Sequence, residues 1–272
     1  MAARRRLDAE LVRRGLARSR AHAAELIEAG RVRVRGFVAS KAAAGVDPAD
    51  PVLLGGDTED YVSRGAHKLV GALAAFAPLG VTVSGRRCLD AGASTGGFTD
   101  VLLREGAREV VAVDVGYGQL AWSLRTDDRV RVLDRTNIRH LSGEDIDGQV
   151  DVTVADLSFI SLRLVLPALA ACTRDDGVIV PMVKPQFEVG RDKIGAKGVV
   201  RDPEVRAEAV VTVASAAAEL GWSPVGVSRS PLPGPAGNVE FFCVLRRDAD
   251  AMSAERIRDA VIASSEERRD TA

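Results

Sequence analysis

Charged side chains recur at the ends of apolar segments from residue 87 onward in this 272-residue chain. Five successive segments that read as strands each end in, or are directly followed by, an acid or a lysine. In an open α/β sheet the ligand binds outside the carboxyl ends of the strands. We therefore expect the active site at that edge, formed by Asp90, Asp114, Asp134, Asp156 and Lys184.

A glycine-rich turn follows the first of these acids. The sequence from Arg87 to Phe98 reads as a short strand, an acid, a turn of the form G-x-S-x-G-G and the start of a helix. Glycine lets the backbone approach a ligand closely, and a helix start presents free N–H groups. The turn lacks the Lys-Ser/Thr ending of an ATP loop and the G-x-G-x-x-G spacing of a dinucleotide loop, which favours S-adenosylmethionine. The cofactor residues expected here are Asp90, Gly92, Ser94, Thr95, Gly96, Gly97 and Phe98.

Further polar residues are expected to hold the rest of this cofactor. Asp114 ends the second strand, 24 residues after the first acid, a spacing that suits a carboxylate binding the ribose hydroxyls. Asp134 or Asn137 could hydrogen-bond the adenine amino group. Asp156 is expected where the methyl acceptor meets the sulfonium, and Trp122 either covers a cofactor face or packs in a helix core.

The lysine at the fifth strand end indicates a hydroxyl rather than an amine as methyl acceptor. Amine methylation typically uses an Asn/Asp-Pro-Pro-aromatic motif, which this sequence lacks, whereas a ribose hydroxyl benefits from a base. A lysine acts as a base near neutral pH only if it is desolvated or lies beside another cation. We expect Lys184 to be the base and Lys68 to be the second cation. Asp156 would orient both amines, and Glu240 would accept a hydrogen bond from the hydroxyl or from a lysine.

The structural alternative gives these four residues no chemistry. In that interpretation Lys68–Asp156 and Lys184–Glu240 are surface ion pairs.

The pattern between these residues predicts an α/β fold of the class I, Rossmann-like methyltransferase type. Apolar segments alternate with helical ones, which indicates a doubly wound, mostly parallel sheet. The last two strands are joined by too few residues for a crossover helix and should form an antiparallel hairpin. The expected helices lie near residues 97–105, 118–125, 160–171 and 203–220. The seven expected strands are 87–91, 109–114, 130–134, 151–155, 177–183, 224–229 and 239–246.

The N-terminal part is strongly basic and reads as a small α+β head that binds RNA. Residues 1–41 hold eleven Arg/Lys against four Asp/Glu, a local charge of +7 that leaves −8 for the remainder. Two short helices, over 6–15 and from Ser19 to Gly30, precede a strand over 31–35 that alternates apolar and basic residues. The alternative is a merely solvated charged face. The expected RNA contacts are Arg4, Arg6, Arg14, Arg18, Arg20, Arg31, Arg33, Arg35, Arg64 and His67.

The remaining features bound the organisation and the compartment. We expect an RNA-binding domain and linker over 1–60 with a turn at 55–57, a catalytic domain over 61–250 and a polar tail over 251–272 that forms a fraying helix. The uncharged segment 69–85 contains Gly and Pro, so we expect a buried helix and a turn rather than membrane insertion. Three widely spaced cysteines offer no metal spacing and no disulfide framework, which fits the cytoplasm.

These motifs together resemble the TlyA or hemolysin A family of ribosomal RNA 2′-O-methyltransferases. That family pairs an S-four-type RNA-binding domain with an FtsJ/RrmJ-like catalytic domain, and the resemblance covers residues 5–247. The motifs that carry it are Val62-Ser-Arg-Gly-Ala-His-Lys-Leu69, Asp90-Ala-Gly-Ala-Ser-Thr-Gly-Gly-Phe-Thr99, Asp114-Val-Gly-Tyr-Gly-Gln-Leu120, Asp156-Leu-Ser-Phe-Ile160, Lys184-Pro-Gln-Phe-Glu188 and Gly237-Asn-Val-Glu240.

The resemblance implies a more specific activity than the residues alone. It implies a catalytic tetrad that falls on Lys68, Asp156, Lys184 and Glu240. It also implies a cytidine 2′-hydroxyl target in 16S and 23S rRNA of the 30S and 50S subunits, with no obligatory protein partner. Rival classes fit less well. A small-molecule methyltransferase gains nothing from a basic head, a pseudouridine synthase does not need the glycine turn, and a pore-forming toxin needs a membrane-active segment.

Overall fold

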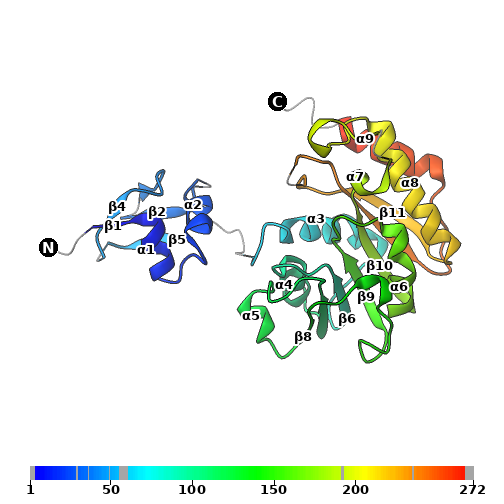
Figure 1. Ribbon diagram of the computed structural model, residues 1–272, viewed down its shortest axis with the longest axis horizontal. Coiled ribbons are helices and arrows are strands. Elements are labelled where there is room, and N and C mark those ends of the chain that lie inside the picture. Colours follow the sequence, from blue (N-terminus) through cyan, green and yellow to red (C-terminus); the bar gives the residue numbers. More distant parts are fainter. Residues whose placement is uncertain are drawn as a thin grey trace. The chain divides into compact units, whose positions relative to one another are not determined.

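The computed structural model describes residues 4–28, 30–35, 37–48, 50–54, 61–190, 193–234 and 236–266. The chain divides into two compact units, Met1–Asp60 and Tyr61–Ala272 (Figure 1). The turn expected at residues 55–57 lies outside the described residues.

The N-terminal unit, called the head below, packs two short helices on small antiparallel sheets. Ser19 caps the second helix, since its Oγ accepts a hydrogen bond from His22 N at 3.1 Å. The core contains the apolar residues expected on the inner helix faces, among them Leu7, Leu11 and Leu26, although Val12 is only partly buried. The elements are β1 (Arg5–Arg6), α1 (Leu7–Arg13), α2 (Arg20–Glu28), β2 (Val32–Val34), β3 (Phe37–Val38), β4 (Gly45–Val46) and β5 (Val52–Leu54), paired as β3-β2-β5 and β1-β4.

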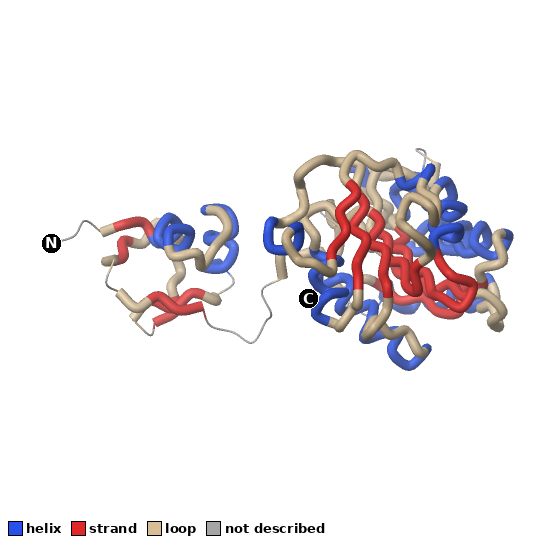
Figure 2. Tube along the Cα trace, turned by 90° about the horizontal axis from the view of Figure 1, so that it is seen from below, coloured by secondary structure: helices blue, strands red, loops and turns tan. Residues whose placement is uncertain are grey.

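The C-terminal unit is built on one seven-stranded sheet in the order β11-β12-β10-β9-β6-β7-β8 (Figure 2). Pairing is parallel from β10 to β8, whereas β12 is antiparallel to both β10 and β11. The predicted fold, including the antiparallel hairpin at one edge, is therefore confirmed. The strands are β6 (Arg87–Ala91), β7 (Glu109–Val113), β8 (Val130–Leu133), β9 (Val150–Ala155), β10 (Thr173–Val183), β11 (Ser223–Arg229) and β12 (Phe241–Arg246).

Helices cover both faces of this sheet, because alternate strand residues point to opposite sides. Leu89 packs in the core beneath α6, α8 and α9, and its neighbour Cys88 packs in the core beneath α3 and α4. The helices are α3 (Ala66–Phe76), α4 (Gly97–Arg104), α5 (Trp122–Arg125), α6 (Leu166–Cys172), α7 (Pro185–Glu188), α8 (Pro203–Glu219) and α9 (Ala254–Glu266), with short 3-10 turns η1 (Ala77–Leu79), η2 (Ile138–His140), η3 (Leu162–Leu164) and η5 (Ala196–Gly198).

Two predicted helices are shorter than expected. The segment predicted as helix over 118–125 is helical only in α5, because its earlier residues bind the glycine turn instead: Ala121 N donates to Thr95 O at 3.1 Å. The helix predicted over 160–171 begins as η3 and becomes α-helical at Leu166, since Pro167 is tolerated only in a first turn.

The segment predicted as a polar tail contains a docked helix. Ile257 and Val261 of α9 are buried at 2% and 0% exposure, on the face that packs on α8 and β11. These residues lie four apart in the sequence, so the apolar stripe was present there. Residues 267–272 lie outside the described part.

Close packing of α3 against the loop before β12 yields the first testable expectation. Alanine in place of a helix-interior glycine ordinarily stabilises by about 1 kcal/mol. At Gly71, however, a Cβ atom would lie 2.6 Å from Cγ of Pro231. We expect Gly71→Ala to lower the free energy of unfolding by about 1–3 kcal/mol, measured by denaturant titration. Adding Pro231→Ala should recover most of this loss, and a stability gain from Gly71→Ala alone would contradict the packing argument.

Candidate functional site

The glycine turn after β6 brings three parts of the chain close together. Gly92 has φ +90°, and a Cβ there would lie 2.5 Å from the backbone oxygen of Asp156. A Cβ on Gly97 would meet Ser63 Oγ and lie 2.9 Å from Ala66 N. Only glycine fits both positions, so the turn joins the start of α3, the start of α4 and the end of β9.

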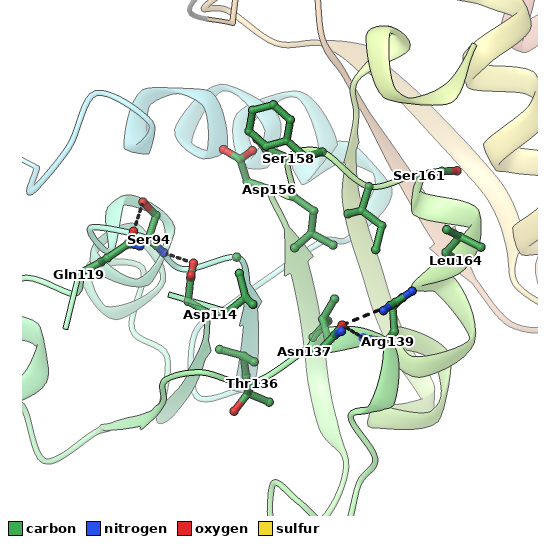
Figure 3. Close-up of a pocket in the computed structure, with 17 residues that line it drawn as sticks. Ser94, Asp114, Gln119, Thr136, Asn137, Arg139, Asp156, Ser158, Ser161 and Leu164 are labelled. Atoms are coloured by element: carbon green, nitrogen blue, oxygen red, sulfur yellow. Dashed lines mark hydrogen bonds between the residues drawn. The ribbon is translucent and has the colours of Figure 1, made fainter. Parts of the chain in front are cut away.

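Two adjoining cavities open at this edge of the sheet, and Figure 3 shows the residues that line the larger one. The larger, of about 610 Å³, is lined by Asp114 and Asn137 on one side and by residues 156–161 on the other. The smaller, of about 150 Å³, lies over the glycine turn, where Thr95, Gly97 and Phe98 contribute to its wall. Both cavities share Gly92, Ser94 and Asp156.

The residues expected around ribose and adenine are only partly brought to this cavity. Asp114 accepts hydrogen bonds from Ser94 N at 2.8 Å and Gly116 N at 2.7 Å, which fix its carboxylate at the cavity wall. Asn137 lines the cavity, and its Oδ1 accepts from Arg139 N at 3.1 Å.

Two other expected residues do not line it. The Asp134 carboxylate pairs with Arg125 at 2.6 Å, which holds the pKa of Asp134 below its usual range. Trp122 is 76% exposed, so it is neither a helix-core residue nor part of the cavity wall.

Asp90 is fully buried at the end of β6. Its Oδ2 accepts a hydrogen bond from Thr99 Oγ1 at 2.7 Å, while its Oδ1 is buried without a hydrogen-bond partner among the residues that the structure describes. Burial raises the pKa of Asp90 to about 7, against the Thr99 hydrogen bond and with a further contribution from the charges of Asp156 and Asp114. A buried carboxyl oxygen without a partner is costly unless a ligand satisfies it.

Two lysine–carboxylate pairs lie beside the cavities. Both lysines and Glu240 are buried, whereas Asp156, which lines both cavities, has a side chain that is 21% exposed. Lys68 Nζ on α3 donates to Glu240 Oε2 at 2.6 Å, and Lys184 Nζ lies 2.5 Å from Asp156 Oδ1. The side chains of Lys68, Lys184 and Glu240 are 11%, 8% and 1% exposed. The alternative of two surface ion pairs is therefore wrong, both in exposure and in the choice of partners.

Strand register brings these two pairs to the same edge of the sheet. Val183 of β10 pairs with Phe241 of β12, so Lys184 follows and Glu240 precedes the last paired residues of neighbouring strands. Pro181 of β10 pairs in parallel with Ala155 of β9, directly before Asp156. Glu240 was expected within the last strand, but it lies one residue before β12.

The loop after β9 carries two residues to which the sequence assigned no role. Ser158 Oγ accepts a hydrogen bond from Lys184 Nζ at 2.9 Å. Phe159 is 91% exposed, has φ +63°, and its ring lies 5.3 Å from that of Phe187. Both residues lie in the motif from Asp156 to Ile160. Their position next to an acid at a strand end was therefore the feature of the sequence that could have indicated a role for them. The left-handed backbone was not visible in the sequence.

Some of the arginines expected to bind RNA already form ion pairs within the head. Arg6 and Arg20 both hold the buried carboxylate of Asp8, at 2.9 Å each. These pairs, led by the Arg6 hydrogen bond, hold the pKa of Asp8 well below its usual range.

Other expected RNA contacts also have structural partners. Arg14 binds Glu10 at 2.8 Å and the carbonyl oxygens of Pro48 and Asp50, and Arg35 pairs with Asp50 at 2.7 Å. Arg31 is half-buried, whereas the remaining expected contacts are exposed: Arg4, Arg18, Arg33, Arg64 and His67. In the second unit, the ring of His67 meets that of Tyr61 edge-on at 5.4 Å.

Within the described ranges, no helix is long and apolar enough to cross a membrane. The same residues include no cluster of three or more His, Cys, Asp or Glu that could hold a metal ion.

Comparison with known proteins assigns a family model to each unit. The FtsJ-like methyltransferase model matches residues 61–247, and the S4 domain model matches residues 5–52. The chain is 63% identical to the 16S/23S rRNA (cytidine-2′-O)-methyltransferase TlyA of Mycobacterium tuberculosis, over 96% of this chain and 97% of that protein. It is 35% identical to Hemolysin A of Brachyspira hyodysenteriae, over 87% of this chain and 98% of that protein.

A solved structure from Streptococcus thermophilus, which also carries the hemolysin name, matches the whole chain. It shares 38% identity at a TM-score of 0.76 and covers 99% of this chain and 98% of its own.

The raised pKa of Asp90 yields a pH-dependent stability. Between the ordinary carboxyl value near ~4 and about 7, the folded protein keeps a proton that the unfolded chain has released. The free energy of unfolding should therefore fall as pH rises through this window. We expect this fall to be smaller in Asp90→Asn, measured by denaturant titration at several pH values. Parallel pH curves for the two proteins would show that Asp90 titrates alike in both states.

Proposed function

The chain belongs to the FtsJ-like methyltransferase family and carries an S4 domain, and from this premise we propose that it is an S-adenosylmethionine-dependent ribosomal RNA 2′-O-methyltransferase. Its target is the ribose of cytidine in 16S and 23S rRNA of ribosomal subunits, in line with the activity in the name of its 63%-identical relative. The observation that supports this function most directly is the presence of two lysine–carboxylate pairs, each with a buried lysine, at the strand ends beside the cavity.

The residues around the two cavities fit S-adenosylmethionine, which supplies an electrophilic methyl group on a sulfonium. The glycine turn leaves room for a ligand, because a Cβ at Gly92 would close the approach to Asp156, and Gly92, Ser94 and Asp156 line both cavities. Asp90 is fully buried beneath the turn and lines neither cavity, so we give it no direct contact with the cofactor. Asp114 can accept the ribose hydroxyls with its remaining lone pairs. Asn137 suits adenine better than Asp134, because Asn137 lines the cavity whereas Asp134 holds Arg125.

The lysine pairs provide what a ribose hydroxyl requires. We assign Lys184 as the general base that accepts the hydroxyl proton, with Asp156 and Ser158 orienting its amine. Lys68 adds a positive charge where the alkoxide develops, and Glu240 holds Lys68 in place. This division of roles differs from the expectation that Asp156 orients both amines, because Glu240 is the partner of Lys68.

RNA binding is assigned to both units. The head supplies cationic side chains for phosphates, led by the exposed Arg18 and Arg33. Phe159 offers an exposed ring at the cavity wall, on which the base of the target nucleotide can stack. A substrate that is part of the ribosome also fits the expected cytoplasmic location, because ribosomal subunits are found there.

The first test of this function replaces the base. Lys184→Ala should keep cofactor binding and lose methylation, because the missing group acts mainly in the transition state. Lys184→Arg should also be inactive, since guanidinium stays protonated. Methylation of ribosomal subunits is measured by mass-spectrometric mapping of 2′-O-methyl groups, and cofactor binding by calorimetry. Asp114→Ala serves as the reference for weakened cofactor binding, with a loss of about tenfold or more in affinity. Near-normal turnover by Lys184→Arg would reject the general-base role.

A second test concerns the head. Arg18→Glu should weaken binding to ribosomal RNA. It should also make the slope of log affinity against log salt concentration shallower, by the amount that corresponds to about one or two lost phosphate contacts. Arg20→Glu is unsuitable for this test, because it replaces a partner of the buried Asp8 carboxylate with a like charge. The matched control is Arg108→Glu. Arg108 is exposed and directly precedes β7, so it lies at the amino ends of the parallel strands, whereas the cavity lies at their carboxyl ends. Equal losses from both charge reversals would contradict a specific role of the head.

A further inference from the structure

Glu188 is a buried carboxylate at the end of the short segment that begins with Lys184. It ends α7, four residues after Lys184, and its side chain is 1% exposed. Its Oε1 accepts a hydrogen bond from Leu162 N at 2.7 Å, and its Oε2 accepts one from Ser161 Oγ at 2.6 Å. Arg163 is half exposed, and its Nε lies 3.9 Å from Oε2 of Glu188. Burial raises the pKa of Glu188, because removal from water disfavours the charged form of a carboxyl group.

The two hydrogen bonds of Glu188 belong to a longer contact between two segments. Residues 184–188 meet residues 156–162 at three successive points. Lys184 binds Asp156 and Ser158 at the first point, and the ring of Phe187 lies against Phe159 at the second. Glu188 binds Ser161 and Leu162 at the third. The loop 156–161, of which Asp156, Ser158 and Ser161 are labelled in Figure 3, thus has side-chain contacts at both of its ends.

The third contact is the one that fixes the far end of this loop. Leu162 N is a donor at the start of η3, where no turn precedes it to accept a helical hydrogen bond. Glu188 supplies that acceptor and also holds the hydroxyl of Ser161, the N-cap residue of η3. Without Glu188 the contacts of Lys184 and Phe187 with this loop would remain, but Ser161 and Leu162 would lose the two hydrogen bonds that hold the far end of the loop.

We propose that Glu188 is a positioning residue for the methyl-transfer site, one that acts through Ser161 and Leu162. It holds the loop so that Asp156 and Ser158 meet the amine of Lys184 in one geometry and Phe159 keeps its exposed orientation. Glu188 touches neither substrate nor cofactor in this role. The proposal rests on the proposed function, in which Lys184 is the base.

The test compares two substitutions at Glu188 in the full chain. Glu188→Ala should lower kcat for methylation of ribosomal subunits by about ten- to a hundredfold, because a small displacement of a reacting group has a large effect on rate. The affinity for S-adenosylmethionine should change by less than about twofold, since the glycine turn and Asp114 are untouched. Glu188→Gln should retain most of the activity, because its amide oxygen can accept from Leu162 N and its amide nitrogen can donate to Ser161 Oγ.

Two further measurements separate positioning from a general loss of stability. Val213→Ala on α8 removes apolar atoms from a fully buried side chain outside this loop, and it should lower stability without changing kcat. Hydrogen exchange of the amides in residues 157–162 should be faster in Glu188→Ala than in the wild-type protein or in Val213→Ala.

Each outcome decides the proposal. Unchanged kcat or unchanged exchange in folded Glu188→Ala would overturn the positioning role, as would a Glu188→Gln variant that is as impaired as Glu188→Ala. Full activity of Lys184→Ala would reject the base itself. Full activity of Glu188→Ala beside an inactive Lys184→Ala would reject only the role of Glu188.

Discussion

Two ammonium groups inside a folded protein require partners, and this requirement shapes the catalytic unit. Withdrawing a charge from water costs several kcal/mol unless an opposite charge and further hydrogen bonds replace the lost hydration. Lys68 and Lys184 meet the requirement with one carboxylate each, and Ser158 adds a second contact for Lys184. Such pairs contribute little to stability compared with apolar packing, so stability alone does not account for them.

The fold meets this requirement by gathering residues that are far apart in the sequence. Glu240 lies 172 residues after its partner Lys68, and Asp156 and Lys184 follow different strands. Parallel strands deliver their ends to one edge, and the antiparallel β12 delivers its beginning to that same edge. The site therefore forms only when α3 and the strands from β12 to β7 in the sheet order are in place, which couples the chemistry to the folding of the whole unit.

The sequence predicted the elements of the sheet more securely than it predicted contacts. The apolar period identified β6 with its observed bounds, and the short link before β12 indicated the hairpin. Which acid would hold which lysine depends on strand register, a property that composition does not carry. Asp134 and Arg20 show the same limit. Asp134 lies at a strand end and Arg20 at a helix start, as expected, but folding pairs Asp134 with Arg125 and Arg20 with Asp8. Likewise, no sequence pattern showed that Phe159 would adopt a left-handed backbone.

That backbone at Phe159 has a consequence for protein engineering. A non-glycine residue at φ +63° bears conformational strain, and an exposed ring contributes little burial in return. A procedure that optimises folding stability alone would favour glycine at residue 159, because glycine adopts this backbone conformation without strain. The redesigned enzyme would melt at a higher temperature and present a bare backbone where the natural protein presents an aromatic face. A strained backbone under an exposed aromatic ring is thus a feature that folding stability alone does not explain.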